Sequence, residues 1–409
     1  MKLQKIIFLA LFILSFSLNA QVNIEQTKHD NDLKLSALPY YSFGKGVGLT
    51  SPDSLFQFNI RFRMQNRVSY IENDGEKPGY DGQIRRLRLR FDGYVINPKF
   101  LYAIQLSFAP GDVGEIHEGE NINIIRDAVF FYRPNKNWNI SFGQTKLPGN
   151  RQRVNSSGGL QLTDRTINNA KFTIDRDFGF QIHNMNEFRD KLSYNFKAAF
   201  TTGEGRNSTE KADDGIAATG KIELMPFGAF TKDGTYFEGD VVREKKPKLL
   251  ISGAFQQNNH ARRTQGQLGN DLFEKRTMKS VLLDGMFKYN GWAAMMSYMS
   301  RSTTENAVTF NPDDATETSY VFVGNGFDYQ ASYITKSNYE FITRYSIQNV
   351  GKDIQALAPN TREISFGVTK YIWEHAFKLQ AEINFDKLEY FNGTTKNNWY
   401  ARLQVEIGI

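Results

Sequence analysis

The chain has 409 residues, no cysteine and a formal net charge of +6. The absence of cysteine excludes disulfide frameworks and thiolate metal sites, and so small a positive charge gives no argument for nucleic-acid binding. Aromatic residues make up 14% of the chain, although its mean hydropathy is only −0.49. Alternation of apolar and polar side chains along strands would reconcile these two properties.

The first twenty residues have the order of a cleavable signal peptide. Two lysines precede an apolar run at 6–18, and the small residue Ala20 follows it. The run is too short for a spanning helix, and no later stretch of about 18 continuous apolar residues exists. We therefore predict a signal peptide at 1–20, with an uncleaved anchor as the alternative. Without Lys2 and Lys5 the mature chain has 48 basic and 44 acidic residues, a net charge of +4.

From Leu55 onward the side chains alternate with a period of two, as in a strand with one apolar and one polar face. Apolar residues occupy even positions from Phe56 to Met64, and polar residues occupy the odd positions between them. The pattern recurs at 87–95, 102–108, 138–142, 178–182, 192–200, 292–298, 327–333, 339–345, 364–368, 377–385 and 399–409. Weaker segments at 122–132, 216–225, 248–256 and 278–288 bring the predicted total to about sixteen strands.

A soluble β-sandwich would alternate as well, so the lengths of the connections decide between the two folds. Long connections are expected near 71–83, 109–121, 145–176, 202–215, 257–277, 302–319, 347–361 and 387–397, and mostly short ones between them. Only the connection at about 226–246 breaks this order. Long extracellular loops alternating with short periplasmic turns are typical of a closed transmembrane antiparallel β-barrel.

The predicted organisation is a signal peptide at 1–20, a periplasmic lead-in segment at 21–54 and an outer-membrane barrel at 55–409. The last strand, which runs to Ile409, is expected to pair with the first and so remove the edges of the sheet. Aromatic residues at strand ends suit the girdles at the membrane interfaces: Tyr70, Phe100, Trp138, Phe200, Trp292 and Trp399.

Several stretches of the chain, in this order, resemble the phosphate-selective porin O/P family. They include Phe58–Arg63, Ile84–Gly93, Asn97–Phe100, Arg126–Ala128, Phe142–Pro148, Arg176–Gly179 and Tyr339–Tyr345. The resemblance extends over roughly 55–409. It implies a sixteen-stranded, homotrimeric barrel in the bacterial outer membrane that passes phosphate or other anions.

If the apolar faces contact lipid, basic side chains of two adjacent strands line the lumen. The longest connection, 145–176, adds more of them, and by family analogy such a loop folds inward and narrows the pore. The predicted pore-lining, substrate-binding residues are Arg61, Arg63, Arg67, Arg86, Arg88, Arg90, Lys146, Arg151, Arg153 and Arg165. Arginine stays charged and offers several donors, so a ladder of arginines attracts anions without holding them.

The alternative is that these arginines form ion pairs that brace the barrel wall. Closure of the barrel would bring Arg402 and Glu406 beside the first strand, with Lys378, Glu382 and Asp386 one strand further. Arg85 falls on the lipid-facing side of the alternation, and we expect it to extend toward the membrane surface.

We expect a passive diffusion channel for small solutes with anion or phosphate preference, and no enzyme. One alternative is a plugged or structural barrel that binds surface ligands through its loops without conducting. Another is an outer-membrane hydrolase, but the five scattered histidines give no catalytic constellation and no metal spacing. No cofactor or nucleic acid is expected; the expected partners are outer-membrane lipid, lipopolysaccharide, small anions such as phosphate, and two further copies of the chain.

Overall fold

The computed structural model describes residues 46–113, 123–208, 215–314 and 316–409. The predicted signal peptide and residues 21–45 of the predicted lead-in lie outside the described residues. Residues 47–50, at the end of that lead-in, form a short strand, β1 (Val47–Thr50), which pairs with β2 alongside the ring described next.

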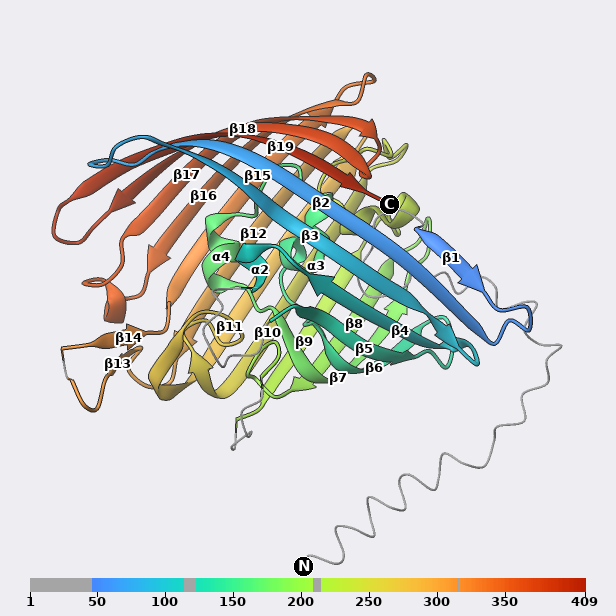
Figure 1. Cartoon of the computed structure of the whole chain (residues 1–409), viewed down its shortest axis with the longest axis horizontal. Helices are drawn as coiled ribbons and strands as arrows, with labels where there is room; N and C mark the ends of the chain where they lie inside the picture. Colours follow the sequence, from blue (N-terminus) through green and yellow to red (C-terminus); the bar gives the residue numbers. More distant parts are fainter. Residues whose placement is uncertain (1–45, 114–122, 209–214, 315) are drawn as a thin grey trace, which may run out of the picture. The chain divides into compact units, whose positions relative to one another are not determined.

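Sixteen antiparallel strands form a closed ring, in which β19 pairs with β2 and β9 pairs with β10 (Figure 1). The predicted fold class is confirmed. The strands of the ring are β2 (Phe56–Glu72), β3 (Gly79–Val95), β4 (Asn97–Ser107), β5 (Ile125–Tyr132), β6 (Trp138–Lys146), β7 (Arg176–Asn186), β8 (Ser193–Thr201), β9 (Ala217–Met225), β10 (Lys248–Arg263), β11 (Asp271–Tyr289), β12 (Trp292–Thr303), β15 (Gly324–Ile334), β16 (Tyr339–Val350), β17 (Asn360–Trp373), β18 (Phe377–Glu389) and β19 (Thr395–Gly408).

The distribution of buried residues is the reverse of that in a soluble protein. Phe180 and Phe200 are 60% and 58% exposed, whereas the charged residues Asp92, Lys378 and Glu406 are fully buried. Strands β8 and β9 alternate strictly between buried and exposed positions. Apolar side chains therefore face outward and polar side chains face the lumen, as the bilayer requires.

The connections follow the predicted order, with differences in length. Three of the expected long connections are short, at 73–78, 264–270 and 390–394, because the flanking strands continue further than the sequence pattern indicated. The loop at 304–323 contains a small hairpin of β13 (Val308–Phe310) and β14 (Thr318–Tyr320). At the opposite end, Asn290 and Gly291 make the β11–β12 turn with positive φ angles of 48° and 91°, as tight hairpins need.

Two connections fold into the lumen. The first, residues 147–175, is called the inward loop; it carries α3 (Arg151–Val154), η3 (Ser157–Gly159) and α4 (Ile167–Phe172). The second, residues 226–247, is called the second insert and carries η4 (Thr231–Tyr236). The inward loop is one of the long connections, whereas the second insert joins two strands at the end of the barrel that carries the short turns. The two connections therefore enter the lumen from opposite ends of the barrel.

Candidate functional site

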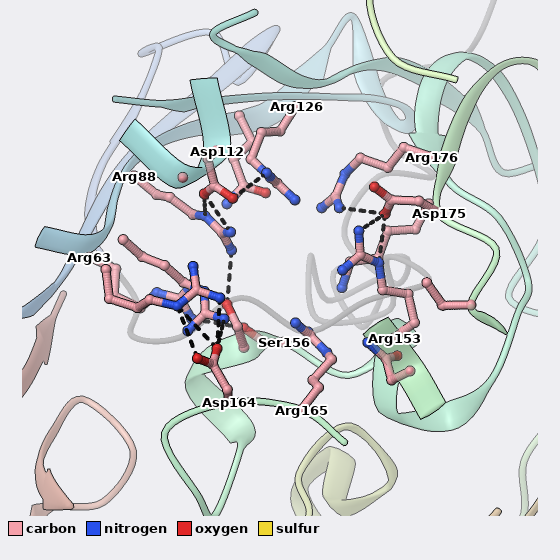
Figure 2. Close-up of a pocket in the computed structure, with 18 of the residues that line it drawn as sticks. Arg63, Arg88, Asp112, Arg126, Arg153, Ser156, Asp164, Arg165, Asp175 and Arg176 are labelled. Carbon is pink, nitrogen blue, oxygen red and sulfur yellow. Dashed lines mark hydrogen bonds and ion pairs between the residues drawn. The ribbon is translucent and has the colours of Figure 1, made fainter. Parts of the chain in front are cut away.

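A cavity of about 540 Å³ lies between the inward loop and the wall of the ring near β2–β7. Figure 2 shows arginine side chains from the wall and from the loop around its open centre. This arginine cavity is lined by twelve basic residues and three acidic ones. The basic residues are Arg61, Arg63, Arg85, Arg86, Arg88, Arg90, Arg126, Lys146, Arg153, Arg165, Arg176 and Arg206, and the acidic residues are Asp112, Asp164 and Asp175.

The wall of the cavity follows from the alternation of the strands. On β2 and β3 the arginines occupy alternate positions and therefore face the lumen. The register pairs Arg61 with Arg90 and Arg63 with Arg88. Directly opposed like charges repel, so the arrangement needs neighbouring carboxylates or hydroxyls to offset it.

Arg85 does not extend toward the membrane surface as predicted. Gln65 pairs with Arg86 and Asn66 pairs with Ile84, which leaves Arg85 as the extra residue of a β-bulge in β3. A bulge redirects a side chain that strict alternation would place on the other face. Arg85 Nη2 accordingly donates to Asp164 of the inward loop, at 2.7 Å.

Asp164 connects the inward loop to the wall. Its carboxylate pairs with Arg67 at 2.5 Å, Arg85 at 2.7 Å and Arg86 at 3.0 Å, and Arg402 lies 3.8 Å away. Ser157, in the same loop, accepts hydrogen bonds through Oγ from Arg63 and Arg88, at 2.5 and 2.9 Å. The loop is thus held against the arginines that the sequence singled out.

The other two carboxylates of the cavity are also shared between arginines. Asp112, in the short helix α2 (Pro110–Val113), pairs with Arg88 and Arg126, each at 2.8 Å. Asp175 pairs with Arg153 and with Arg176 at 3.3 Å, and Arg206 lies 4.0 Å from it. Three carboxylates line the cavity beside twelve cations. Behind the lining, Asp92, Asp127 and Glu406 pair with further lining arginines, namely Arg61, Arg90, Arg176 and Arg63. Twelve cations and six carboxylates leave a positive excess.

The protonation of the loop residues reflects this excess of positive charge. Burial would raise the pKa of Asp164, but the neighbouring arginines, led by Arg86, hold it well below its ordinary range. The pKa values of Asp112 and Asp175 are lowered in the same way by their arginine partners. Conversely, burial together with repulsion from Arg153 lowers the pKa of Arg165.

Arg165 differs from its neighbours in its partners. Nε donates to the backbone oxygen of Gln152 at 2.7 Å, and Nη2 donates to that of Asn155 at 3.1 Å. Within the described part of the chain, no carboxylate lies at ion-pair distance from Arg165. Its guanidinium group therefore adds a charge to the cavity that carbonyl dipoles balance only in part.

The structure brings eight of the ten predicted residues into the arginine cavity: Arg61, Arg63, Arg86, Arg88, Arg90, Lys146, Arg153 and Arg165. Arg67 lies behind the lining, paired with Asp164. Arg151 points away from the cavity and forms a buried ion pair with Glu223 of β9. Sequence reasoning missed Arg85, Arg126 and Arg206 as lining residues, and only the lumenal parity of β5 could have indicated Arg126. Arg176, a basic residue of the 145–176 connection, was expected to add charge there but was not among the ten predicted residues.

The predicted contacts at the closure of the barrel are present. Glu406 lies 3.4 Å from Lys378 and 3.7 Å from Arg63, and Arg402 lies 3.6 Å from Glu382. Bracing of the wall and lining of the cavity therefore occur together, and Arg63 takes part in both.

The inward loop crosses the lumen to the opposite wall. Lys378 of β18 donates to the backbone oxygens of Gly158 and Leu160 at 2.9 and 2.7 Å, and Arg301 of β12 donates to that of Lys171 at 2.7 Å. A Cβ atom at Gly326 of β15 would overlap the side chain of Asn168, so only glycine at this position leaves room for the inward loop.

The second insert packs against the inward loop. Glu238 accepts from Gln152 and from the backbone N–H of Gln161, at 3.2 and 3.0 Å, and its own N–H donates to Gly159. The buried Lys288 of β11 donates to the backbone oxygens of Gly234, Phe237 and Gly239, at 2.7–2.8 Å. The two connections thus fill the part of the lumen away from the arginine cavity.

Among the described residues, no group of three or more histidine, aspartate or glutamate side chains could hold a metal ion, and no helix is long and apolar enough to cross a membrane.

Comparisons with known proteins agree with this architecture. The model of the family phosphate-selective porin O and P matches residues 58–232. A search of curated proteins by sequence found no significant match.

Among solved structures, the fold is similar to OmpF of Salmonella typhi, solved with daunomycin, at a TM-score of 0.56 and 13% identity over 88% of this chain and 100% of that chain. The outer-membrane channel DcaP of Acinetobacter baumannii gives 0.54 and 12%, over 89% and 100%. The anion-selective porin from Comamonas acidovorans gives 0.51 and 10%, over 87% and 100%.

Sequence identities as low as these support a shared fold and nothing more. The family match, in contrast, covers the strands and the inward loop that build the arginine cavity. Together they support an outer-membrane channel. The resemblance to the phosphate-selective porin O and P family is therefore confirmed over residues 58–232, and the chain has the fold of a porin of the bacterial outer membrane.

Proposed function

We propose that the protein is a passive channel for small anions, phosphate among them, and that the arginine cavity is the passage they take. The observation that carries the proposal is the charge of the lining, in which twelve basic side chains face three carboxylates. Electrostatic attraction of this kind concentrates anions in a narrow lumen and excludes cations.

The mechanism requires weak binding at several neighbouring positions. Arginines on β2, β3, β5 and β7 face those of the inward loop, so a phosphate can exchange donors stepwise without losing them all at once. Phosphate itself is supported by the family name and by this chemistry. The same donors would accept other anions of similar size.

A second candidate is a plugged barrel that binds surface ligands without conducting. It is favoured by one observation: the inward loop and the second insert meet across the lumen, where Glu238 contacts both Gln152 and Gln161. Filling of this kind leaves less open cross-section than an empty ring of sixteen strands would.

Single-channel recording separates the two candidates. The purified protein would be inserted into a planar bilayer under a KCl gradient, and phosphate would then be added. Stable current steps that phosphate partly blocks are expected of the anion channel. A folded, heat-modifiable barrel that gives no steps would overturn the proposal in favour of the plugged barrel.

The resemblance also implies a homotrimer, which we keep as part of the proposal. Chemical cross-linking of the protein in detergent, followed by separation without heating, would measure it. A monomer as the largest species would contradict the trimer and leave the proposed passage, which one chain builds alone, unaffected.

A further inference from the structure

The outer wall of the ring carries two adjoining hollows over the strands next to its closure, on the side opposite the lumen. The upper hollow, of about 350 Å³, includes Arg362, Lys387 and Trp399. The lower hollow, of about 780 Å³, is almost entirely apolar and includes Phe366, Ala381, Ile383, Ala401 and Leu403.

The strand register makes the two hollows continuous. Arg362 on β17 pairs with Lys387 on β18, which pairs with Asn397 on β19. Two residues along each strand from this charged row, the next outward-facing row consists of Ile364, Phe385 and Trp399. Two residues further, the following row consists of Phe366, Ile383 and Ala401. A charged row therefore lies directly above an aromatic row and a deeper apolar one.

The charged row lies at the end of the ring that carries the expected extracellular loops. Arg362 and Lys387 lie near the ends of β17 and β18 that adjoin the connections at 351–359 and 390–394, on the same side as the other expected extracellular loops. Their side chains are 56% and 48% exposed, and both lie near Glu389, at 3.7 and 2.7 Å. Glu363 and Asp386 also line the upper hollow, but they alternate with the outward-facing positions of β17 and β18. The exposed cations of the row are therefore Arg362 and Lys387, which share Glu389.

We propose that these hollows bind one molecule of lipid A, the phosphorylated lipid anchor of lipopolysaccharide. A phosphate accepts hydrogen bonds from Arg362 and Lys387, and one acyl chain lies in the lower hollow. Ala381 and Ala401 give this hollow its depth, because small side chains there stand between Phe366 and Leu403. A cationic rim above an apolar slot matches an amphiphile of the outer leaflet, in which polar and apolar parts divide at this level.

The test measures bound lipid A by native mass spectrometry, after the delipidated barrel is incubated with lipid A in detergent. The double variant R362Q/K387Q removes the charged row, and Ala381→Phe fills the lower hollow. Two matched controls sit elsewhere on the outer wall. Lys370→Gln removes a cation from the opposite end of β17, and Ala294→Phe enlarges a small outward residue of β12.

We expect one lipid A per barrel, an affinity about tenfold lower in R362Q/K387Q, a comparable loss in Ala381→Phe, and no change in either control. Dephosphorylated lipid A is expected to bind the double variant and the native protein equally. Equal retention of lipid A by all variants would mean nonspecific lipid contact and would overturn the proposal. The proposal would also be overturned if Ala381→Phe changed the oligomeric state of the protein in the absence of lipid, because the surface would then bind a second copy of the chain. Heat-modifiability shows whether each variant is folded. The charge variant and the filling variant test the two hollows separately.

Discussion

At the scale of single residues, Arg151 and Arg153 show how neighbouring arginines of one loop come to do different things. The sequence offers no means of separating them, because both lie in the same short basic run. In the structure Arg153 lines the arginine cavity, whereas Arg151 forms a buried pair with Glu223 and donates to the backbone oxygen of Thr235. Arg153 therefore contributes to the field of the passage, and Arg151 fastens the inward loop.

This difference predicts two separable phenotypes. Arg153→Gln is expected to reduce the anion over cation permeability ratio about twofold, which corresponds to ~0.4 kcal/mol for one screened charge. It should cost less stability than Arg151→Gln, because Arg153 is partly exposed and Asp175 keeps Arg176 and Arg206 as neighbours. Arg151→Gln leaves Glu223 with two lysine neighbours and a hydrogen bond from Asn195. We expect a cost on the order of 2 kcal/mol in stability, measured as a lower heat-modifiability temperature. Equal effects of both variants on selectivity and stability would contradict the assignment.

A second residue-scale prediction concerns pH. The pKa values of Asp112, Asp164 and Asp175 are held below their ordinary range, so these carboxylates stay charged as the pH falls to 4. A carboxyl group whose pKa is lowered by folding stabilises the fold above its unfolded pKa, and this contribution is lost only as the pH falls through the lower, folded value. The contribution of these three carboxylates to anion selectivity and to loop anchoring should therefore be constant from pH 7 to pH 4. Reversal potentials of the native protein and of Asp112→Asn, compared at each pH, check this. A difference between the two proteins that disappears between pH 5 and pH 4 would mean that Asp112 titrates normally.

At the scale of elements, the alternation of side chains was sufficient to predict most strands and the lumenal face of β2 and β3. The alternation failed to predict the position of Arg85, because an additional residue in a strand changes which face of the sheet the neighbouring side chains point to. It also could not show where the inward loop makes contact, since those contacts involve residues far apart in sequence. Asp164, for example, meets Arg67, Arg85 and Arg402 on three strands.

The second insert was recognised in the sequence only as an exception to the order of long and short connections. Its backbone oxygens are held by Lys288, which is nearly completely buried. Lys288→Met would remove three hydrogen bonds to the insert, and we expect a larger or noisier single-channel conductance as the insert loosens. Lys279→Met, an outward-facing substitution on the same strand, is the matched control. Identical conductance in both variants would show that the second insert does not limit the passage.

At the scale of the whole molecule, the lumen divides into two parts with different roles. On one side the inward loop and the second insert pack against each other and against β11, β12, β15 and β18. On the other side the loop contacts β2 and β3 through Asp164 and Ser157, and the arginine cavity lies between the loop and the wall at β2–β7. The barrel alone, which the alternation predicted, would not have revealed this division, because it depends on how two irregular connections fold.

The division also explains how one ring can combine ion pairs that brace the wall with an excess of positive charge. The carboxylate of Asp164 forms ion pairs with Arg67, Arg85 and Arg86. Among the described residues, Arg165 has no carboxylate partner and donates to backbone oxygens instead. The braced arginines hold the loop in place, and the remaining charge faces the open centre.

The central claim is that small anions pass through the arginine cavity. The most direct test is the reversal potential in a KCl gradient for the native protein and for a variant with Arg86, Arg88, Arg153 and Arg165 replaced by glutamine. We expect an anion-selective potential that moves toward cation selectivity in the variant, with heat-modifiability retained. An unchanged reversal potential in a folded variant would contradict the claim and assign these arginines to bracing alone.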